Sequence, residues 1–449
     1  MTPEMAGSLD DFAGAVAPTR VVDVDLARGI GAIARDGDAG TAYRRARVQV
    51  RLHGKPLGSV DLDLVEGRLA ATDVAARIWE SLEPNINRHL DSDGLDSVSS
   101  LSPSGIGRIP NPRCVQARER SCANGPMISI VLATYGRPKG LARTLDSLAE
   151  LKYRRFEIVL VDNAPETPYI RELFERESGR FDNLRYVTET VRGLTPARIR
   201  GVEAAAGEIV AFTDDDVVVD PYWLAELATA FELREDIACV TGLTLPLELD
   251  TPAQMWFEEF GGFSKGFSPQ VFNMRENRPP DPLFPYAIGR IGSGNNMAWR
   301  VDLLSRLGGF DPRTTNTGAE DISAFFDAIT KGFTIAYEPA AIIFHEHRRK
   351  YADLERQMYW YGIGLGAYLT RCLLSNRKHM LRFAARSPAG LRYLVSSKSA
   401  KNKAKLATYP RELTRLERRG ALRGPFVYLR GMRDHPRRAS PDAVNLRSA

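Results

Sequence analysis

The chain has 449 residues, of which 43% are hydrophobic and 26% are charged. These are the proportions of an ordinary globular protein of a few domains, and they exclude a wholly disordered chain, a collagen-like repeat and a disulfide scaffold. The net charge of +5 hides a split, because residues 371–449 carry +16 and residues 1–370 carry −11. A basic tail on an acidic body predicts that the tail meets an anionic surface.

Cysteine content and targeting signals bear on the location. Cys114 and Cys122 lie eight residues apart, and free thiols are favoured there over a disulfide or part of a metal site. The N-terminus has neither a basic segment nor an apolar run, and no stretch of about 18 apolar residues occurs in the sequence. We therefore expect a cytoplasmic protein.

Composition and periodicity divide the chain. Alternating apolar residues on both sides of His53-Gly54 predict a hairpin, and helical spacing follows from Val74. Ser, Pro, Gly and Arg then dominate up to Pro126, as in a linker. The predicted segments are a loosely ordered N-terminus (1–40), a small α+β domain (41–92), a linker (93–126), a larger domain (127–350) and a helical, basic extension (351–449).

The larger domain alternates apolar runs with helical stretches. The runs cover residues 128–133, 156–161, 184–187 and 209–213. This alternation predicts an α/β fold, Rossmann-like, with a mostly parallel sheet and helices on both faces. Ligands bind such sheets beyond the carboxyl ends of the strands, so the residues directly after each run are the functional candidates.

Three consecutive aspartates, Asp214 to Asp216, follow the fourth run. They repel one another, and capping of the next helix does not require them because Asp220-Pro221 can supply that cap. Hard carboxylate oxygens suit Mg²⁺ or Mn²⁺, which commonly bridge to substrate phosphates. The triplet therefore favours a divalent cation site.

Five segments together resemble glycosyltransferase family 2. They are Val131–Pro138, Val159–Asn163, Gly193–Gly201, Phe212–Asp216 and Gly318–Asp321. The resemblance implies a GT-A fold and an inverting transfer of a sugar from a nucleotide-diphosphate sugar. One departure is Ile199, which replaces an Asn of the family pattern.

The resemblance also implies a role for each matching residue. Mn²⁺ or Mg²⁺ would bind at Asp216 and His345, Asp321 would be the general base, and Glu320 would bind acceptor hydroxyls or position the base. The residues implied to contact the nucleotide and the donor are Thr134, Tyr135, Arg137, Asp162, Arg198, Asp214 and Asp215. The acceptor and sugar pocket falls on Gly294, Asn295, Asn296 and Trp299. The insert from Trp256 to Tyr286 is expected to form an acceptor-side flap.

Plainer interpretations of these residues stay open. Glu320-Asp321 can serve as acidic residues at a helix N-terminus, Gly294-Asn295 as a turn, and His345 as a structural histidine. A non-catalytic nucleotide-sugar scaffold and a nucleotidyltransferase are the alternative functions. A nucleotidyltransferase normally begins with a glycine-rich loop, and the turn at Gly136 contains too few glycines for one.

The extension suggests a location rather than chemistry. Leu354, Met358 and Tyr361 recur on one helical face, as in a helix packed on the catalytic domain; an interfacial helix with Trp360 at the lipid headgroups is the alternative. No nucleic-acid module is recognisable, so we expect no nucleic-acid partner. An anionic inner membrane face fits the basic residues better. The predicted partners are thus a nucleotide-sugar donor, a glycan or lipid-linked acceptor and an anionic membrane surface.

Overall fold

The computed structural model describes residues 17–37, 41–64, 67–107, 109–315, 317–375 and 408–434. Much of the predicted basic tail, including Arg377, Lys378 and the run from Lys398 to Lys405, lies outside these residues.

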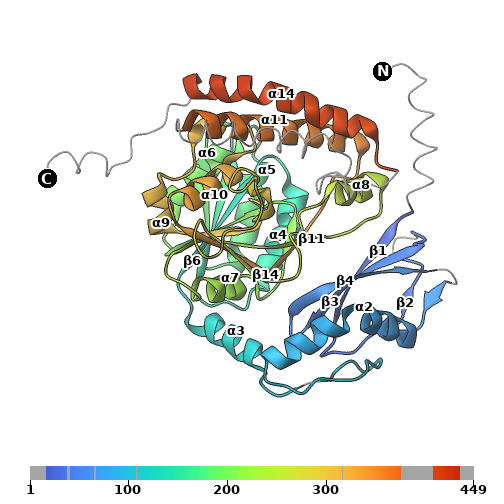
Figure 1. Ribbon diagram of the computed structural model, residues 1–449. Helices are drawn as coiled ribbons and strands as arrows, with labels where there is room; N and C mark the ends of the chain where they lie inside the picture. Colours follow the sequence, from blue (N-terminus) through green and yellow to red (C-terminus); the bar gives the residue numbers. More distant parts are fainter. Residues whose placement is uncertain are drawn as a thin grey trace, which may run out of the picture.

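The N-terminal part of the chain forms a three-stranded sheet, a separate two-stranded sheet and one helix (Figure 1). Its elements are β1 (Thr19–Asp25), β2 (Ile33–Ala34), β3 (Arg45–Leu52), β4 (Lys55–Asp63), β5 (Arg68–Leu69) and α2 (Ala71–Ser92). The predicted hairpin is present as β3 and β4, and β1 adds to β3 in parallel. Valines and leucines of the hairpin pack against Val74, Ile78 and Ile86 of α2. Strands β1 and β2 correct the expectation of loose order within residues 1–40, because Val22 and Val24 turn toward this core.

The larger domain is built on a mixed sheet of nine strands. Its order is β10-β14-β11-β13-β9-β6-β7-β8, with β12 paired to β14. The strands are β6 (Ile128–Thr134), β7 (Phe156–Asn163), β8 (Leu184–Glu189), β9 (Ile209–Asp214), β10 (Val217–Val219), β11 (Ile237–Pro246), β12 (Gln270–Phe272), β13 (Met297–Arg300) and β14 (Thr334–His345). The four predicted strands β6 to β9 are confirmed and are parallel to one another. Strand β13 is antiparallel to both of its neighbours.

Helices cover both faces of this sheet, as predicted. Apolar residues of α4 (Pro138–Ala149), α5 (Tyr169–Glu177) and α7 (Trp223–Phe231) form the core on one face. Residues of α6 (Leu194–Ala204), α9 (Val301–Leu307), α10 (Glu320–Thr330) and α11 (Tyr351–Ser375) form the core on the other. Short 3-10 turns lie at Ser178–Arg180, Ile288–Arg290 and Pro312–Thr314.

The predicted linker contains a helix of its own. Helix α3 (Arg113–Asn124) packs on α7, where the Ser121 hydroxyl donates to the Ala225 carbonyl over 3.1 Å. Its polar composition concealed it in the sequence, since its described side chains bury only Arg118 and Ser121. The connection between the N-terminal sheet and the larger domain is therefore partly ordered by contact with the larger domain.

The C-terminal helices α11 and α14 (Arg411–Asp434) lie side by side across the top of the domain in Figure 1. Leu354 and Met358 of α11 are fully buried, so the packed helix is the arrangement observed. Helix α8 (Pro252–Phe260) contacts the start of this pair. Within the described ranges, every helix is too short or too polar to traverse a lipid bilayer.

Glycines set the close approach of α11 to α14. A Cβ on Gly362 would lie 2.0 Å from the Glu417 carbonyl oxygen, and one on Gly424 would lie 2.4 Å from that of Ile363. Such distances leave no room for a side chain. The backbone contact of the two helices therefore requires glycine at these positions.

We expect Gly424→Leu to destabilise the helix pair by about 1–3 kcal/mol, because the added side chain would enter the Ile363 backbone. Thermal denaturation and limited proteolysis of α14 measure the effect. Leu422→Ala is the matched control, because Leu422 lies on the same helix and is 76% exposed. Equal stability of the two variants would contradict the packing described.

Candidate active site

The predicted site residues meet at the carboxyl ends of adjacent strands. The register pairs Thr134 of β6 with Asp162 of β7, and Ala133 with Asp214 of β9. Because these three strands are parallel and neighbouring, their last residues share one edge of the sheet. This edge is the place that the sequence predicted for ligand binding.

A second strand pairing brings a histidine to the aspartates. Strand β10 pairs with β14 so that Val217 lies opposite His345. The Nε2 atom of His345 consequently lies 3.2 Å from Oδ1 of Asp216. One ligand atom from each of Asp214, Asp216 and His345 lies within 4.8 Å of the others, an arrangement that can hold a metal ion.

Cations hold Asp216 in its ionised form. Nη1 of Arg137 lies 2.9 Å and Nη1 of Arg348 3.3 Å from its Oδ2 atom. Burial favours the protonated carboxyl, but His345 and these two arginines outweigh it and keep the pKa of Asp216 well below its usual range. Its carboxylate is thus available as a hard oxygen ligand.

The other two aspartates are shifted the opposite way. Burial, with the charge of Asp216 beside it, raises the pKa of Asp215 to about 6. Its Oδ2 accepts a 2.6 Å hydrogen bond from the Thr134 hydroxyl, which ties the ends of β6 and β9 together. Burial likewise raises the pKa of Asp214, and the charge of Arg198 opposes that shift.

A chain of side chains runs behind His345. Its Nδ1 lies 3.2 Å from Nδ1 of His347, whose Nε2 lies 2.9 Å from Oε1 of Glu258 on α8. The second oxygen of Glu258 accepts a 3.1 Å hydrogen bond from Arg47 of β3. The orientation of His345 is therefore supported from the N-terminal sheet.

The candidate base lies on the other side of the same edge. Oδ2 of Asp321 accepts a 2.8 Å hydrogen bond from the Gly294 amide, at the start of α10. A Cβ on Gly294 would lie 3.0 Å from Cβ of Asp321 and 2.6 Å from Nη1 of Arg198. Glycine is therefore needed here for the backbone to reach the carboxylate.

Arg198 joins the two sides of the site. It is 3% exposed, and it donates to Oε1 of Glu320 and to the carbonyl of Gly294, each over 2.7 Å. Its Nη2 also lies 3.6 Å from Oδ1 of Asp214. One guanidinium thus spans the aspartate cluster and the acidic start of α10.

Two buried polar atoms beside Arg198 lack partners among the described residues. They are Oε2 of Glu320 and Nδ2 of Asn295. Glu320 is 3% and Asn295 4% exposed. Burial, although opposed by Arg198, raises the pKa of Glu320 to about 7. Buried polar atoms are usually paired, so these two indicate where a ligand would complete the hydrogen bonding.

The remaining predicted donor contacts lie at the rim. Asp162 is buried and accepts a 2.6 Å hydrogen bond from the Tyr186 hydroxyl. Tyr135 is 37% exposed, and its hydroxyl donates to Glu166 over 2.9 Å. Asp162 lies at the carboxyl end of β7 and Tyr135 directly follows β6, so both stand at the edge where a nucleotide was predicted to bind.

Two residues predicted for the acceptor pocket occupy the core instead. Asn296 is fully buried, accepts from Nε1 of Trp223 and donates to the carbonyls of Leu243 and Ala341. Trp299 is also fully buried and stacks on Phe325. Asn296 directly precedes β13 and Trp299 lies within it, so the polar atoms of both are used inside the protein. The placement does not support either residue as part of a pocket.

Several residues of the site were not predicted. Glu258, His347 and Arg348 belong to it, as does Tyr361 of α11, whose pKa is raised by burial and to a lesser extent by the charges of Asp214 and Asp321. The His-x-His spacing was visible, but the carboxylate partner lies 89 residues away. The predicted flap also reaches the site, since the Phe263 ring lies 5.0 Å from that of His345.

The sequence was also compared with known proteins. Residues 129–292 match the description of glycosyl transferase family 2. The succinoglycan biosynthesis protein ExoM of Rhizobium meliloti is 30% identical over 269 residues, which cover 57% of this chain and 78% of ExoM. The chain belongs to glycosyl transferase family 2, and it is a glycosyltransferase with the mixed α/β sheet of the GT-A fold.

Two further similar proteins share less sequence identity with this chain. The glucosyl-dolichyl phosphate glucuronosyltransferase of Haloferax volcanii is 24% identical over 251 residues, covering 52% of this chain and 75% of that protein. The mannosyltransferase PcManGT of Pyrobaculum calidifontis, solved with GDP-Man and Mn²⁺, superposes with a TM-score of 0.44 at 19% identity, covering 68% of this chain and 88% of its own.

The raised pKa of Glu320 predicts a pH dependence of stability. Between its ordinary pKa of 4.5 and about 7, the folded chain retains a proton that the unfolded chain has lost, so the free energy of unfolding falls as the pH rises through this window. We expect the wild type to lose on the order of 2 kcal/mol relative to Glu320→Gln across that range. Urea unfolding of both proteins at several pH values measures the difference. A difference that is independent of pH would contradict the shift.

Proposed function

We propose that this glycosyltransferase is a metal-dependent inverting enzyme, which moves a sugar from a nucleotide-diphosphate sugar to a hydroxyl of a glycan or lipid-linked acceptor. The observation that carries the proposal is the placement of two carboxylate sites on one edge of the sheet. The Asp214, Asp216 and His345 cluster forms one site, and Asp321 with Glu320 forms the other. Arg198 bridges the two.

Asp214, Asp216 and His345 fit a divalent cation. Two carboxylates suit Mg²⁺ or Mn²⁺, and the imidazole makes the set better matched to Mn²⁺, which as a transition metal accepts nitrogen more readily. When bound, the cation would offset the charge that develops on the departing nucleotide diphosphate. Arg137 and Arg348 point at the same carboxylate and would bind diphosphate oxygens beside it.

Asp321 is the proposed general base. A sugar hydroxyl is a weak nucleophile near neutral pH, and a carboxylate that accepts its proton as the new bond forms lowers the barrier. The Gly294 amide fixes this carboxylate at the start of α10. Glu320 and Asn295, with their unpaired buried atoms, are proposed to bind acceptor or donor hydroxyls. Direct displacement would invert the anomeric centre.

The donor side is proposed to lie along the ends of β6, β7 and β9. The region where a nucleotide would enter is bordered by Thr134, Tyr135 and Asp162. The carboxylate of Asp215 accepts a hydrogen bond from Thr134 and so holds that side chain in place. Asp214 faces both Arg198 and the metal cluster, so it would contribute to the cation as well as to the nucleotide.

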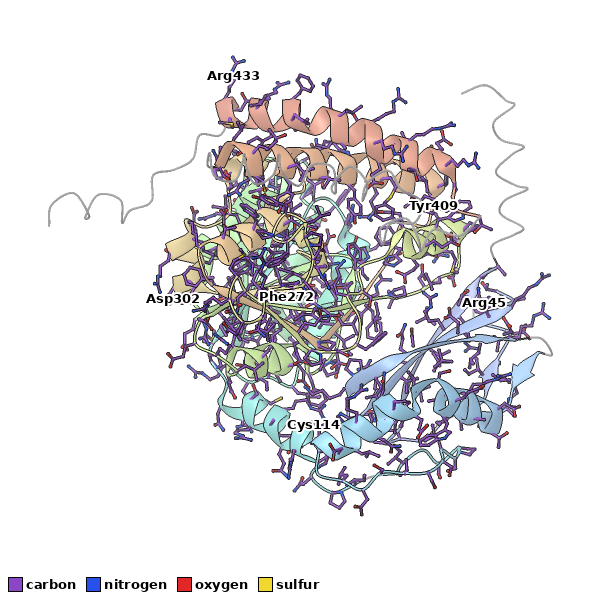
Figure 2. All side chains as sticks on the ribbon, in the orientation of Figure 1. Arg45, Cys114, Phe272, Asp302, Tyr409 and Arg433 are labelled. Atoms are coloured by element: carbon purple, nitrogen blue, oxygen red, sulfur yellow. The ribbon has the colours of Figure 1, made fainter. Side chains whose placement is uncertain are left out.

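Nucleotide diphosphate release from UDP- and GDP-sugars with Mn²⁺ tests the proposal. We expect slow hydrolysis or transfer by the wild type, a loss of activity in Asp216→Ala, and a decrease of about 10²–10⁴-fold in Asp321→Asn, because the proton acceptor is removed. The exposed residue Asp302 on α9 offers the matched control Asp302→Asn, which should retain activity. Side chains including Asp302 are drawn in Figure 2.

The alternatives give different outcomes in the same assay. Tight binding of a nucleotide sugar without any release by the wild type would favour the scaffold. Pyrophosphate release from a nucleoside triphosphate and a sugar phosphate would favour the nucleotidyltransferase.

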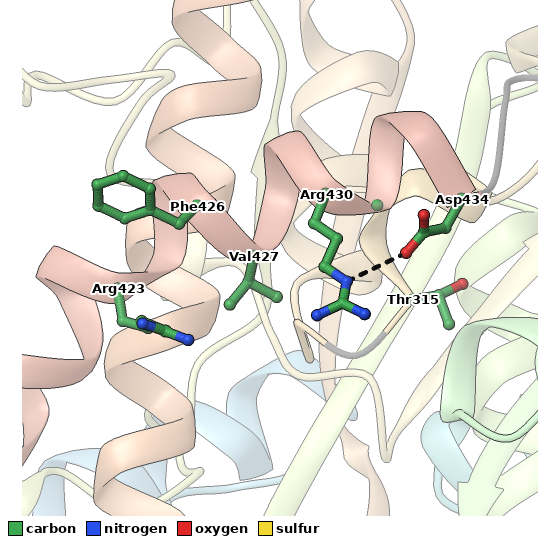
Figure 3. Close-up of a pocket in the computed structure, with 7 residues that line it drawn as sticks. Thr315, Arg423, Phe426, Val427, Arg430 and Asp434 are labelled. Atoms are coloured by element: carbon green, nitrogen blue, oxygen red, sulfur yellow. Dashed lines mark hydrogen bonds and ion pairs between the residues drawn. The ribbon is translucent and has the colours of Figure 1, made fainter.

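Cell-envelope synthesis at the inner membrane face is the proposed setting, and helix α14 supports it. Four large apolar side chains recur at helical spacing on its outer face and are exposed: Leu422, Phe426, Leu429 and Met432. Arginines lie on the same helix, and Figure 3 shows Arg423 near the Phe426 end and Arg430 paired with Asp434. An apolar stripe flanked by cations suits an anionic lipid surface. The name of the Haloferax volcanii relative includes a lipid phosphate, which is consistent with a lipid-linked acceptor.

Flotation with anionic and with zwitterionic vesicles tests this surface. We expect the wild type to float with anionic vesicles only. The double variant Leu422→Ser/Phe426→Ser should lose most of the bound fraction, because the exposed apolar area that would enter the lipid is removed. Leu233→Ser is the control, because Leu233 is also exposed, at 62%, but lies far from α14 in the sequence. Unchanged flotation of the double variant would refute the assignment to α14.

A further inference from the structure

A second cluster of metal-binding side chains lies far from the sugar-transfer site, in the N-terminal part of the chain. It consists of His53, His89, Asp93 and Cys114, and one ligand atom from each lies within 4.8 Å of the others. His53 forms the turn between β3 and β4, His89 and Asp93 end α2, and Cys114 lies in the first turn of α3. Figure 2 marks Cys114 where α3 meets this unit.

We propose that these four residues bind a structural zinc ion. The set of one thiolate, two imidazoles and one carboxylate consists entirely of groups that zinc accepts, and four protein ligands close the coordination sphere as in structural sites. The thiolate and the carboxylate would together balance the charge of Zn²⁺, so the filled site would be neutral. Neutrality matters because the side chains of His53 and Asp93 are 4% and 2% exposed.

The spacing of the ligand atoms agrees with tetrahedral coordination. Zinc bonds of roughly 2.0–2.3 Å place neighbouring ligands about 3.3–3.8 Å apart. Nε2 of His89 lies 3.3 Å from Nδ1 of His53, 3.3 Å from Oδ2 of Asp93 and 3.9 Å from Sγ of Cys114. The same oxygen lies 3.0 Å from His53 and 2.9 Å from Cys114, so small outward movements would admit the ion.

The backbone of the turn places His53 against helix α3. The φ angle of His53 is 56°, in the left-handed region that two-residue hairpin turns normally fill with Asn, Asp or Gly. Arg118 of α3 donates to the His53 carbonyl over 2.6 Å and so holds the turn against the same helix.

The ion would join three elements that are separate in sequence. Helix α3 packs on α7 and leads directly into β6, the strand that ends in the nucleotide-binding turn. Zinc on the hairpin turn, the end of α2 and the start of α3 would fix the N-terminal sheet relative to the catalytic sheet. The site is therefore structural, and it is distinct from the Asp214, Asp216 and His345 cluster.

Elemental analysis of the full-length chain, purified without a histidine tag and dialysed against a chelator, tests the proposal. We expect about one zinc per chain in the wild type and an at least tenfold lower content in His89→Ala and in Cys114→Ser. Cys122→Ser, on the same helix, and Asp216→Ala, in the sugar-transfer site, should retain the zinc. Wild-type protein without stoichiometric zinc, or full zinc content in His89→Ala and Cys114→Ser, would overturn the proposal.

Cobalt substitution covers the case in which a variant fails to fold. The wild type reconstituted with Co²⁺ should show a thiolate-to-cobalt charge-transfer band and the intense visible bands of tetrahedral cobalt, and Cys122→Ser should show them equally. Absence of the thiolate band in the folded wild type would rule out Cys114 as a ligand. Circular dichroism verifies that each variant is folded.

Discussion

The pairing of β10 with β14 is the constraint on which the site depends. It brings together Asp216 and His345, which are 129 residues apart in the sequence, by placing Val217 opposite His345. Removing a carboxylate from water is costly, and Asp216 is tolerated at 5% exposure because His345, Arg137 and Arg348 surround it. A slip of one residue in this register would turn His345 to the opposite face of the sheet and leave the carboxylate without the imidazole.

Ion pairs connect the N-terminal sheet to the catalytic domain. Cations of its hairpin reach carboxylates of the larger domain, and these pairs are Arg47 with Glu258, Arg51 with Asp220, and Lys55 with Glu226. Buried ion pairs of this kind add little net stability, but breaking one leaves an uncompensated charge, so they specify an orientation. Through Glu258 and His347 the same contacts support the imidazole of His345. Several carboxylates within the first 370 residues are therefore paired with arginine or lysine of the same segment.

The sequence predicted those elements that depend on short, local patterns of apolar residues. The strands β6 to β9 were visible as apolar runs, and the residues that end them followed from the geometry of parallel sheets. Asn296 and Trp299 were misjudged because nothing in their short segment indicates that it inserts antiparallel between β9 and β11, where both faces are buried. Strand β1 and helix α3 were missed because their order comes from packing on distant elements. Likewise, the first and last residues of the second cluster are 61 residues apart, and only the fold brings the four together.

Arg198 explains why the two halves of the site can occupy one edge. Asp214 is half-buried and Glu320 is buried, and burial raises the pKa of each carboxyl. The planar guanidinium reaches both carboxylates and the Gly294 carbonyl at once, in directions that a single ammonium group could not satisfy. The same Gly294 donates its amide to Asp321. The position of the proposed base Asp321 therefore depends on Arg198, which also faces Asp214 of the proposed metal site. A change of charge on the donor side would alter the electrostatic potential at Asp321 through this guanidinium.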